Sequence, residues 1–212
     1  MYRAIVTSIS PNAQRSVYQL RKELIKQFEN SPLCQSVIIQ RDPVLLDKSV
    51  ELVSNAKSKV SDSWQQVNKD LLKTFLISPE GLRDTLELEG VDNVAVVGSI
   101  FKTKDYKKIL LPGTPKHKPS QHVSIFGVSY LIEEDDRSLD HIPAGNAEKF
   151  YKHIYPIASQ FLPARFREIT PKHLALAIRL NFETCEFSPT EDGIEELDYV
   201  DCMKIIGLDE RI

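Results

Sequence analysis

The sequence predicts a mixed α+β fold with a helix-rich N-terminal region, residues 1–90, and a C-terminal region of strands and helices, residues 91–212. Two observations support this prediction. Helical periodicity dominates before residue 90, and runs of β-branched and aromatic residues dominate after it. The two regions are either separate domains or parts of one continuous domain, because 212 residues suffice for one large domain or two small ones.

The first elements along the chain predict a short βα unit. Residues 2–9 are rich in Ile, Val and Thr, which favours a strand. Ser10 and Pro11 then provide a helix start, and apolar residues at helical spacing predict a helix over 11–29. Residues 35–40 have the composition of a second strand, so the order strand, helix, strand predicts parallel pairing of the two strands.

The longest periodic pattern in the chain predicts a helix over 43–77. Its apolar residues recur at spacings of three and four in a heptad-like stripe, which is interrupted at Lys57. Such a stripe must be buried, either against the chain's own sheet or in a coiled-coil contact with a second chain. Trp64 lies on the stripe and is expected to be buried in both cases. A shorter helix is predicted over 78–90.

The middle of the chain changes character. Residues 93–101 and 122–132 are predicted strands, because they are rich in β-branched and aromatic residues. Residues 133–145 are acidic and polar, which is typical of a linker or surface loop. A helix interrupted by a proline is predicted over 147–161.

The segment 172–182 has two interpretations. Thr170 and Pro171 form a helix start signal, whereas the apolar residues of the segment alternate as they do in a strand. We favour the strand. Residues 183–212 are acidic, with one apolar stretch around Tyr199, Met203, Ile205 and Ile206.

Composition and charge argue against several classes of protein. Hydrophobic residues are 42% and charged residues 27%, as in ordinary globular proteins, and the net charge of −3 gives no overall basic excess. No apolar run approaches the ~18 residues of a membrane-spanning helix, and the N-terminus lacks a signal-peptide pattern. Cys34, Cys185 and Cys202 show no paired spacing, which argues against a disulfide framework or zinc finger. We expect an intracellular protein, cytoplasmic or nuclear, without metal, cofactor or membrane contact.

A basic segment from residue 102 to residue 118 is the candidate binding site. Three prolines in and beside it oppose a regular helix, so it is predicted to be a loop. Exposed lysines contact phosphates without reading sequence, and Tyr106 is available to stack on a base. The simpler interpretation, which we favour, is a solvated loop whose charge protects a sheet edge; the functional alternative is contact with nucleic acid or another anionic partner. The candidate residues are Lys102, Lys104, Lys107, Lys108, Lys116 and Lys118.

An acidic tract complements the basic segment. From Glu183 to Asp201 there are eight acids and no Lys or Arg. One interpretation is that this tract covers the basic segment and inhibits its binding to nucleic acid. The other, which we favour, is a solubilising surface.

A second group of residues has the chemistry of a hydrolase. Carboxylates and histidines between residues 92 and 141 are suited to divalent metal binding or acid–base catalysis. Their spacing matches no metal-ligand motif, so exposed loop side chains are the simpler interpretation. His122 and Ser124 form half of a two-histidine phosphoesterase pattern whose second copy is missing. The group comprises Asp92, Asp105, His117, His122, Glu133, Glu134, Asp135, Asp136, Asp140 and His141.

Three functional hypotheses remain open. The leading one is a non-enzymatic interaction or assembly protein, which docks a protein partner or a second copy through helix 43–77 and contacts an anion through the basic segment. The first alternative is a metal-dependent hydrolase or nuclease that uses the carboxylates and histidines of residues 92–141. The second alternative is a scaffold with protein partners only.

Overall fold

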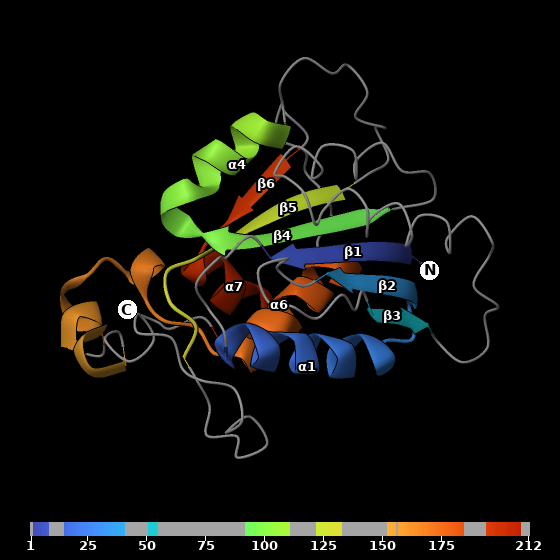
Figure 1. Cartoon of the computed structure of the whole chain (residues 1–212), viewed down its shortest axis with the longest axis horizontal. Helices are drawn as coiled ribbons and strands as arrows, with labels where there is room; N and C mark the ends of the chain where they lie inside the picture. Colours follow the sequence, from blue (N-terminus) through green and yellow to red (C-terminus); the bar gives the residue numbers. More distant parts are fainter. Residues whose placement is uncertain are drawn as a thin grey trace.

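The protein is built on one six-stranded sheet (Figure 1). The computed structural model describes residues 2–8, 15–40, 51–54, 92–110, 122–132, 152–155, 157–184 and 194–208. Its strands are β1 (Tyr2–Ser8), β2 (Cys34–Gln40), β3 (Glu51–Ser54), β4 (Asn93–Ser99), β5 (His122–Val128) and β6 (Ile194–Leu197). The mixed α and β class is therefore confirmed.

The strands lie in the order β3-β2-β1-β4-β5-β6. The pairs β2–β1, β1–β4, β4–β5 and β5–β6 are parallel, and β3 alone is antiparallel to its neighbour β2. The chain moves outward from β1 to β3 and then returns to place β4 on the other side of β1, as in doubly wound sheets. Strands from residues 1–90 and 91–212 thus share one sheet, and a division into domains at residue 90 stays a prediction.

The predicted βα unit at the start of the chain is confirmed. Helix α1 (Arg15–Glu29) connects β1 to β2, which pair in parallel with Ala4 opposite Val37. Leu20, Leu24 and Phe28 are buried and recur every four residues, so they form the face of α1 that packs toward the sheet.

Both faces of the sheet are covered. Alternate strand residues point to opposite faces, and one set, which includes Val97 and Phe126, joins the core under α1, α6 (Pro171–Thr184) and α7 (Tyr199–Ile205). The other set is fully buried on the opposite face: Val94, Val96, Val123 and Ile125. Figure 1 draws α4 (Thr103–Leu110) on the side of the sheet away from α1.

The prediction of a strand over 172–182 is wrong, because this segment lies inside α6. The start signal that precedes it acts as a helix cap: the Thr170 hydroxyl accepts a hydrogen bond from the His173 amide at 3.1 Å. The helical periodicity of α6 is hard to recognise in the sequence because some of its buried residues are small. The buried face includes Ala175 and Ala177 beside larger apolar residues, so the core stripe is wider than the leucines alone suggest.

The basic segment is partly helical, so its prediction as a loop is wrong for residues 102–110. β4 ends at Ser99, earlier than predicted, and a 3-10 turn η1 (Ile100–Lys102) leads directly into α4. The prolines that oppose a helix all follow residue 110. Nothing prevents helix formation before them, and α4 ends before the first of them.

A continuous helix over 43–77 is also wrong, because Glu51–Ser54 forms β3 and pairs with β2. Val53 lies opposite Val37 in this pair, so this part of the apolar stripe belongs to a strand and not to a helix. The rest of that segment, including Trp64, lies outside the described residues, as do the helix predicted over 78–90 and the loop over 133–145.

The last described elements include two that local patterns do not predict, β6 and α7. Asp198 separates them and forms a capping box, in which its side chain accepts from the Val200 and Asp201 amides. Within the predicted helix 147–161, residues 152–155 and 157–158 are helical, and Ser159–Phe161 forms the 3-10 turn η3. No helix in the described part of the chain is long and apolar enough to cross a membrane.

Candidate functional site

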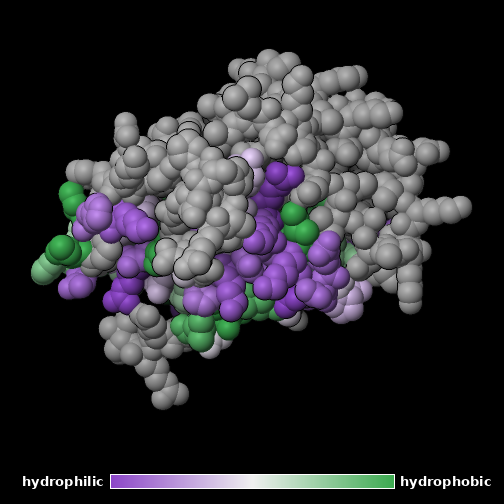
Figure 2. Space-filling model, turned by 60° about the horizontal axis from the view of Figure 1, so that its bottom comes forward, coloured by the Kyte–Doolittle hydropathy of each residue, from purple (hydrophilic) through white to green (hydrophobic). Residues whose placement is uncertain are grey.

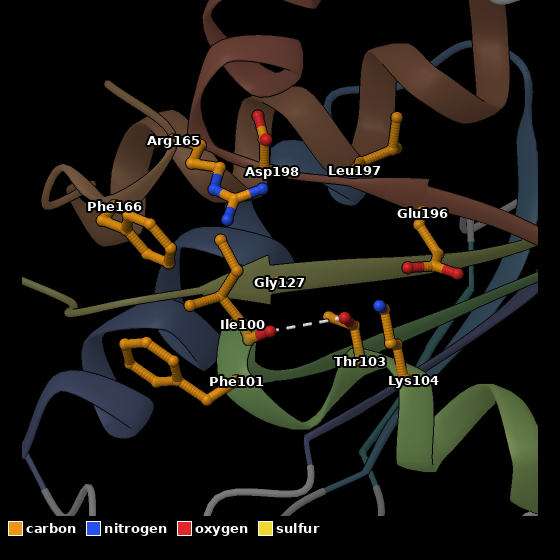
Figure 3. Close-up of a pocket in the computed structure, with 10 residues that line it drawn as sticks. All are labelled: Ile100, Phe101, Thr103, Lys104, Gly127, Arg165, Phe166, Glu196, Leu197 and Asp198. Atoms are coloured by element: carbon orange, nitrogen blue, oxygen red, sulfur yellow. Dashed lines mark hydrogen bonds between the residues drawn. The ribbon is translucent and has the colours of Figure 1, made fainter. Parts of the chain in front are cut away.

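A pocket of about 520 Å³ lies at the carboxyl ends of β4, β5 and β6 (Figure 3). It is bounded by η1 and the start of α4, by Gly127 on β5, by the 3-10 turn η4 (Ala164–Phe166), and by β6 with the residue that follows it. Ligands of open parallel sheets bind at this edge, because the connections after the strands diverge there and leave a crevice. We call it the carboxyl-edge pocket.

Gly127 determines how closely η1 and α4 approach β5. A Cβ atom at this position would lie 2.9 Å from Thr103 Cγ2 and 3.3 Å from the Ile100 Cα. A larger residue would therefore push the start of α4 away from the sheet. The Thr103 hydroxyl donates a hydrogen bond to the Ile100 carbonyl at 3.3 Å, which fixes the junction of η1 and α4 (Figure 3).

An aromatic stack forms one side of the pocket. The rings of Phe101 and Phe166 are nearly parallel, with centroids 5.5 Å apart and an interplanar angle of 12°. The guanidinium carbon of Arg165 lies 4.6 Å from the centroid of Phe166. Phe101 remains 73% exposed despite its contact with Phe166. The stack therefore offers a large aromatic surface to a ligand.

Charged side chains surround the stack. Lys104 and Arg165 line the pocket, and Lys102 is exposed beside it. Two carboxylates also line it, and each has a partner. The Lys107 ammonium lies 3.3 Å from Glu196 Oε1, and one oxygen of Asp198 accepts the amides at the start of α7. The partnered carboxylates leave Lys102, Lys104 and Arg165 as the cations best placed to meet an anion.

The structure brings part of the predicted binding site to this pocket. Lys102 ends η1, and Lys104, Lys107 and Lys108 lie on α4. The side chains of Lys108 and Tyr106 are outside what the structure describes, and so are residues 116 and 118. The Lys107–Glu196 ion pair joins the basic segment to the acidic tract, so the two are in contact at this point.

The aromatic and cationic residues Phe101, Arg165 and Phe166 of the site are missing from the sequence prediction. Phe101 falls in the predicted strand 93–101. No local sequence pattern indicates that the strand ends before Phe101 or that Phe101 is exposed in η1. The other two belong to the run Arg165-Phe166-Arg167, which is an alternating basic and aromatic pattern. Such interleaving is a recognisable feature of nucleic-acid-binding segments and was available in the sequence.

The described members of the hydrolase group do not form one cluster, although the His122 amide donates a hydrogen bond to the Asp92 carbonyl at 2.8 Å where β4 and β5 begin. Asp92 is exposed before β4, Asp105 is exposed on α4, and His122 is buried at the start of β5. Among the residues that the structure describes, no three His, Cys, Asp or Glu side chains are grouped as metal ligands. The remaining candidates, at positions 117, 133–136, 140 and 141, lie outside the described residues.

His122 instead belongs to a buried polar network at the amino ends of β5 and β6. Its Nε2 lies 3.0 Å from Glu195 Oε2 and 3.0 Å from Ser124 Oγ. The Asn181 amide of α6 donates to Ser124 Oγ at 2.9 Å and to Glu195 Oε2 at 3.2 Å. Burial alone would raise the pKa of Glu195, but the hydrogen bonds from His122, Asn181 and Ser124 together lower it.

This network contains Ser, His and Glu but lacks the geometry of a catalytic triad. In a triad the serine and the carboxylate bond to different ring nitrogens, so that a proton passes through the imidazole. Here Ser124 and Glu195 both contact Nε2 of His122. Ser124 is also fully buried, which denies it to a substrate. We therefore assign the network to the packing of α6 on the sheet.

A second buried cluster lies on the other side of Phe182. Glu183 accepts hydrogen bonds from Tyr2, at 3.2 Å, and from Ser31, and its other oxygen lies 3.7 Å from the Arg179 side chain. Burial, with the nearby Glu183 carboxylate, raises the pKa of the Cys34 thiol to about 12. A thiol with such a pKa stays protonated at neutral pH and is a poor nucleophile.

The carboxyl-edge pocket thus combines accessible side chains of varied chemistry, with an aromatic platform, cations and carboxylates around a cavity. Pockets of this volume accommodate small organic ligands or single units of a polymer. Comparisons with protein families, with curated proteins and with solved structures found no match for the chain.

Proposed function

We propose that the protein is a non-enzymatic interaction protein that binds nucleic acid through η1, α4 and the rim of the carboxyl-edge pocket. The observation that carries this proposal is the exposed ring of Phe101 among Lys102, Lys104 and Arg165. Proteins that bind nucleic acid without reading its sequence combine cations that follow the phosphates with aromatic rings that stack on bases. Both kinds of group occur together here.

The charge of the whole molecule limits the strength of this binding. The net charge is −3, so attraction must come from the local cations and not from the overall field. With three phosphate contacts, the plot of log K against log salt concentration for a single strand has an expected slope of about −2. We therefore expect salt-sensitive binding that is clear at low ionic strength and weak at physiological salt.

The test is a fluorescence-anisotropy titration of a labelled mixed-sequence oligonucleotide at several salt concentrations. The variant Lys102→Glu/Lys104→Glu reverses two exposed charges beside the pocket. The matched control Lys22→Glu/Lys26→Glu reverses two exposed charges on α1, on the other side of the sheet. We expect the pocket variant to lose at least about tenfold in affinity at low salt and the control to lose much less. Equal losses, or no salt-sensitive binding of the native chain, would exclude this site.

A protein partner is the second candidate function, favoured by a different surface. Ile154, Ile157, Phe161 and Leu162 are exposed, and Phe161 reaches 83% exposure. Hydrophobic side chains protrude at the left edge of Figure 2, on the side where Figure 1 draws the segment around these residues. Contiguous exposed apolar residues are typical of protein interfaces. Self-association measured by light scattering, with and without Phe161→Ser, tests whether this apolar patch joins two copies.

A further inference from the structure

We infer that the carboxyl-edge pocket binds an unpaired nucleotide, with its base stacked on Phe101 and its phosphate held by Lys104 and Arg165. This inference rests on the proposed nucleic-acid binding and specifies its form. The shared chemistry is that of a nucleotide, which reaches the pocket either as a free molecule or as one unit of a single strand.

The aromatic stack provides the platform for the base. Phe166 contacts both Arg165 and Phe101, and this fixes the orientation of the Phe101 ring. Phe101 keeps 73% of its surface exposed, so much of its ring remains available. A flat base is the ligand that gains most from such a surface, because every base has a π-face that stacks on an aromatic ring.

The base must be unpaired to use this platform. In a duplex the faces of each base are covered by the neighbouring base pairs, and a protein ring reaches them only after the strand opens. The pocket has a volume of about 520 Å³ and is closed on one side by Gly127 and the η1–α4 junction. This space suits one nucleotide and excludes a double helix.

The charges around the pocket suit the other parts of a nucleotide. In Figure 3 the side chains of Arg165 and Lys104 extend toward the cavity from opposite sides. Both are cations that bind phosphate, and Arg does so with two parallel hydrogen bonds. Asp198 also lines the cavity, and a carboxylate accepts hydrogen bonds from sugar hydroxyls and exocyclic amines. The pocket therefore offers a partner for the base, the sugar and the phosphate.

The experiment compares a fluorescein-labelled ten-nucleotide adenine strand with a labelled hairpin duplex, using full-length chain at low salt. The variant is Phe101→Ala, and the control is Leu33→Ala, which removes an exposed apolar side chain that does not line the pocket. We expect Phe101→Ala to weaken single-strand binding by about five- to 150-fold, the range for loss of one base–aromatic stack. We expect no more than about a twofold change for the control, and little effect of either variant on the duplex. The variant Phe101→Trp should retain the affinity, because it keeps a stacking surface.

Competition with adenosine monophosphate distinguishes the two sources of the nucleotide. Displacement of the labelled strand by millimolar or lower concentrations assigns the pocket to a free nucleotide. A strand that resists displacement but still depends on Phe101 assigns it to a single-strand unit. The inference is overturned if Phe101→Ala and Leu33→Ala behave alike, or if strand and duplex bind equally. In that case salt-sensitive binding lost in Lys102→Glu/Lys104→Glu would still support the proposed function, whereas its absence would remove both.

Discussion

Glu196→Gln should strengthen the binding of a nucleic-acid strand, because Glu196 competes with phosphate for Lys107. The two side chains are 3.3 Å apart, and both are partly exposed. Ion pairs of this kind contribute about 0.2–1 kcal/mol, since water and salt screen them. Loss of this competing charge therefore increases affinity by up to about fivefold at low salt. One further phosphate contact makes the salt slope steeper by about 0.7 for a single strand.

The assay is the salt-dependent anisotropy titration described for the binding site, combined with urea unfolding of each variant. Glu23→Gln is the matched control, because Glu23 forms a comparable pair with Lys26, 3.8 Å away, on α1. Both variants remove one negative charge, so a general charge effect would appear in both. The free energy of unfolding should change by less than about 1 kcal/mol in each. Equal affinities and equal salt slopes for the two variants would show that Glu196 does not compete with phosphate for Lys107.

Three other changes test the structure around the pocket and the buried network. Gly127→Ala should lower the free energy of unfolding by about 1–3 kcal/mol, and Thr103→Ser in the same chain should restore part of this, since it removes the methyl group that the new Cβ meets at 2.9 Å. Ser124→Ala should cost about 1–3 kcal/mol in urea unfolding, because the buried amide of Asn181 loses an acceptor; an unchanged midpoint would contradict the network. The lowered pKa of Glu195 means that its carboxylate stabilises the fold above its unfolded pKa of about 4.3, and that this contribution is lost as the pH falls through the lower folded value. Glu195→Gln should therefore flatten the acid side of the stability–pH curve, and curves that remain parallel would count against this assignment.

The first part of the fold is predictable because each element has its own local signal. The strand composition of residues 2–8 and the four-residue spacing on α1 both act within a few residues. Parallel pairing of β1 and β2 then follows from the order of the elements. In these elements the tertiary contacts favour the same secondary structure as the local sequence does.

The errors arise where tertiary contacts select between two local patterns. Val53 belongs to the heptad-like stripe, yet sheet pairing with β2 places it in β3. In α6 the alternating leucines suggest a strand, whereas the buried alanines and the Thr170 cap produce a helix. β6 is acidic because it lies at one end of the described sheet, with Glu196 directed to the basic helix α4.

The lysines of the candidate site could be identified from sequence, but the pocket could not. Lys104 belongs to an evident basic segment. Its aromatic and cationic neighbours Phe166 and Arg165 come from a distant part of the chain, which the backbone hydrogen bonds of Ile169 with Tyr130 and Ile132 hold close to the end of β5. Periodicity and composition carry no information about such proximity.

The end of α6 has a consequence for the uniqueness of the fold. Three consecutive residues there occupy three different environments: Asn181 in one polar network, Phe182 between aromatic rings, and Glu183 in the other polar cluster. A helix that slips by one residue rotates by about 100°, which would place a carboxylate among rings and a ring among polar groups. Any sliding or rotation of α6 would therefore break all three sets of contacts at once. The polar clusters therefore specify one position and orientation of α6 on the sheet. They do so even where they add little to the stability of the fold.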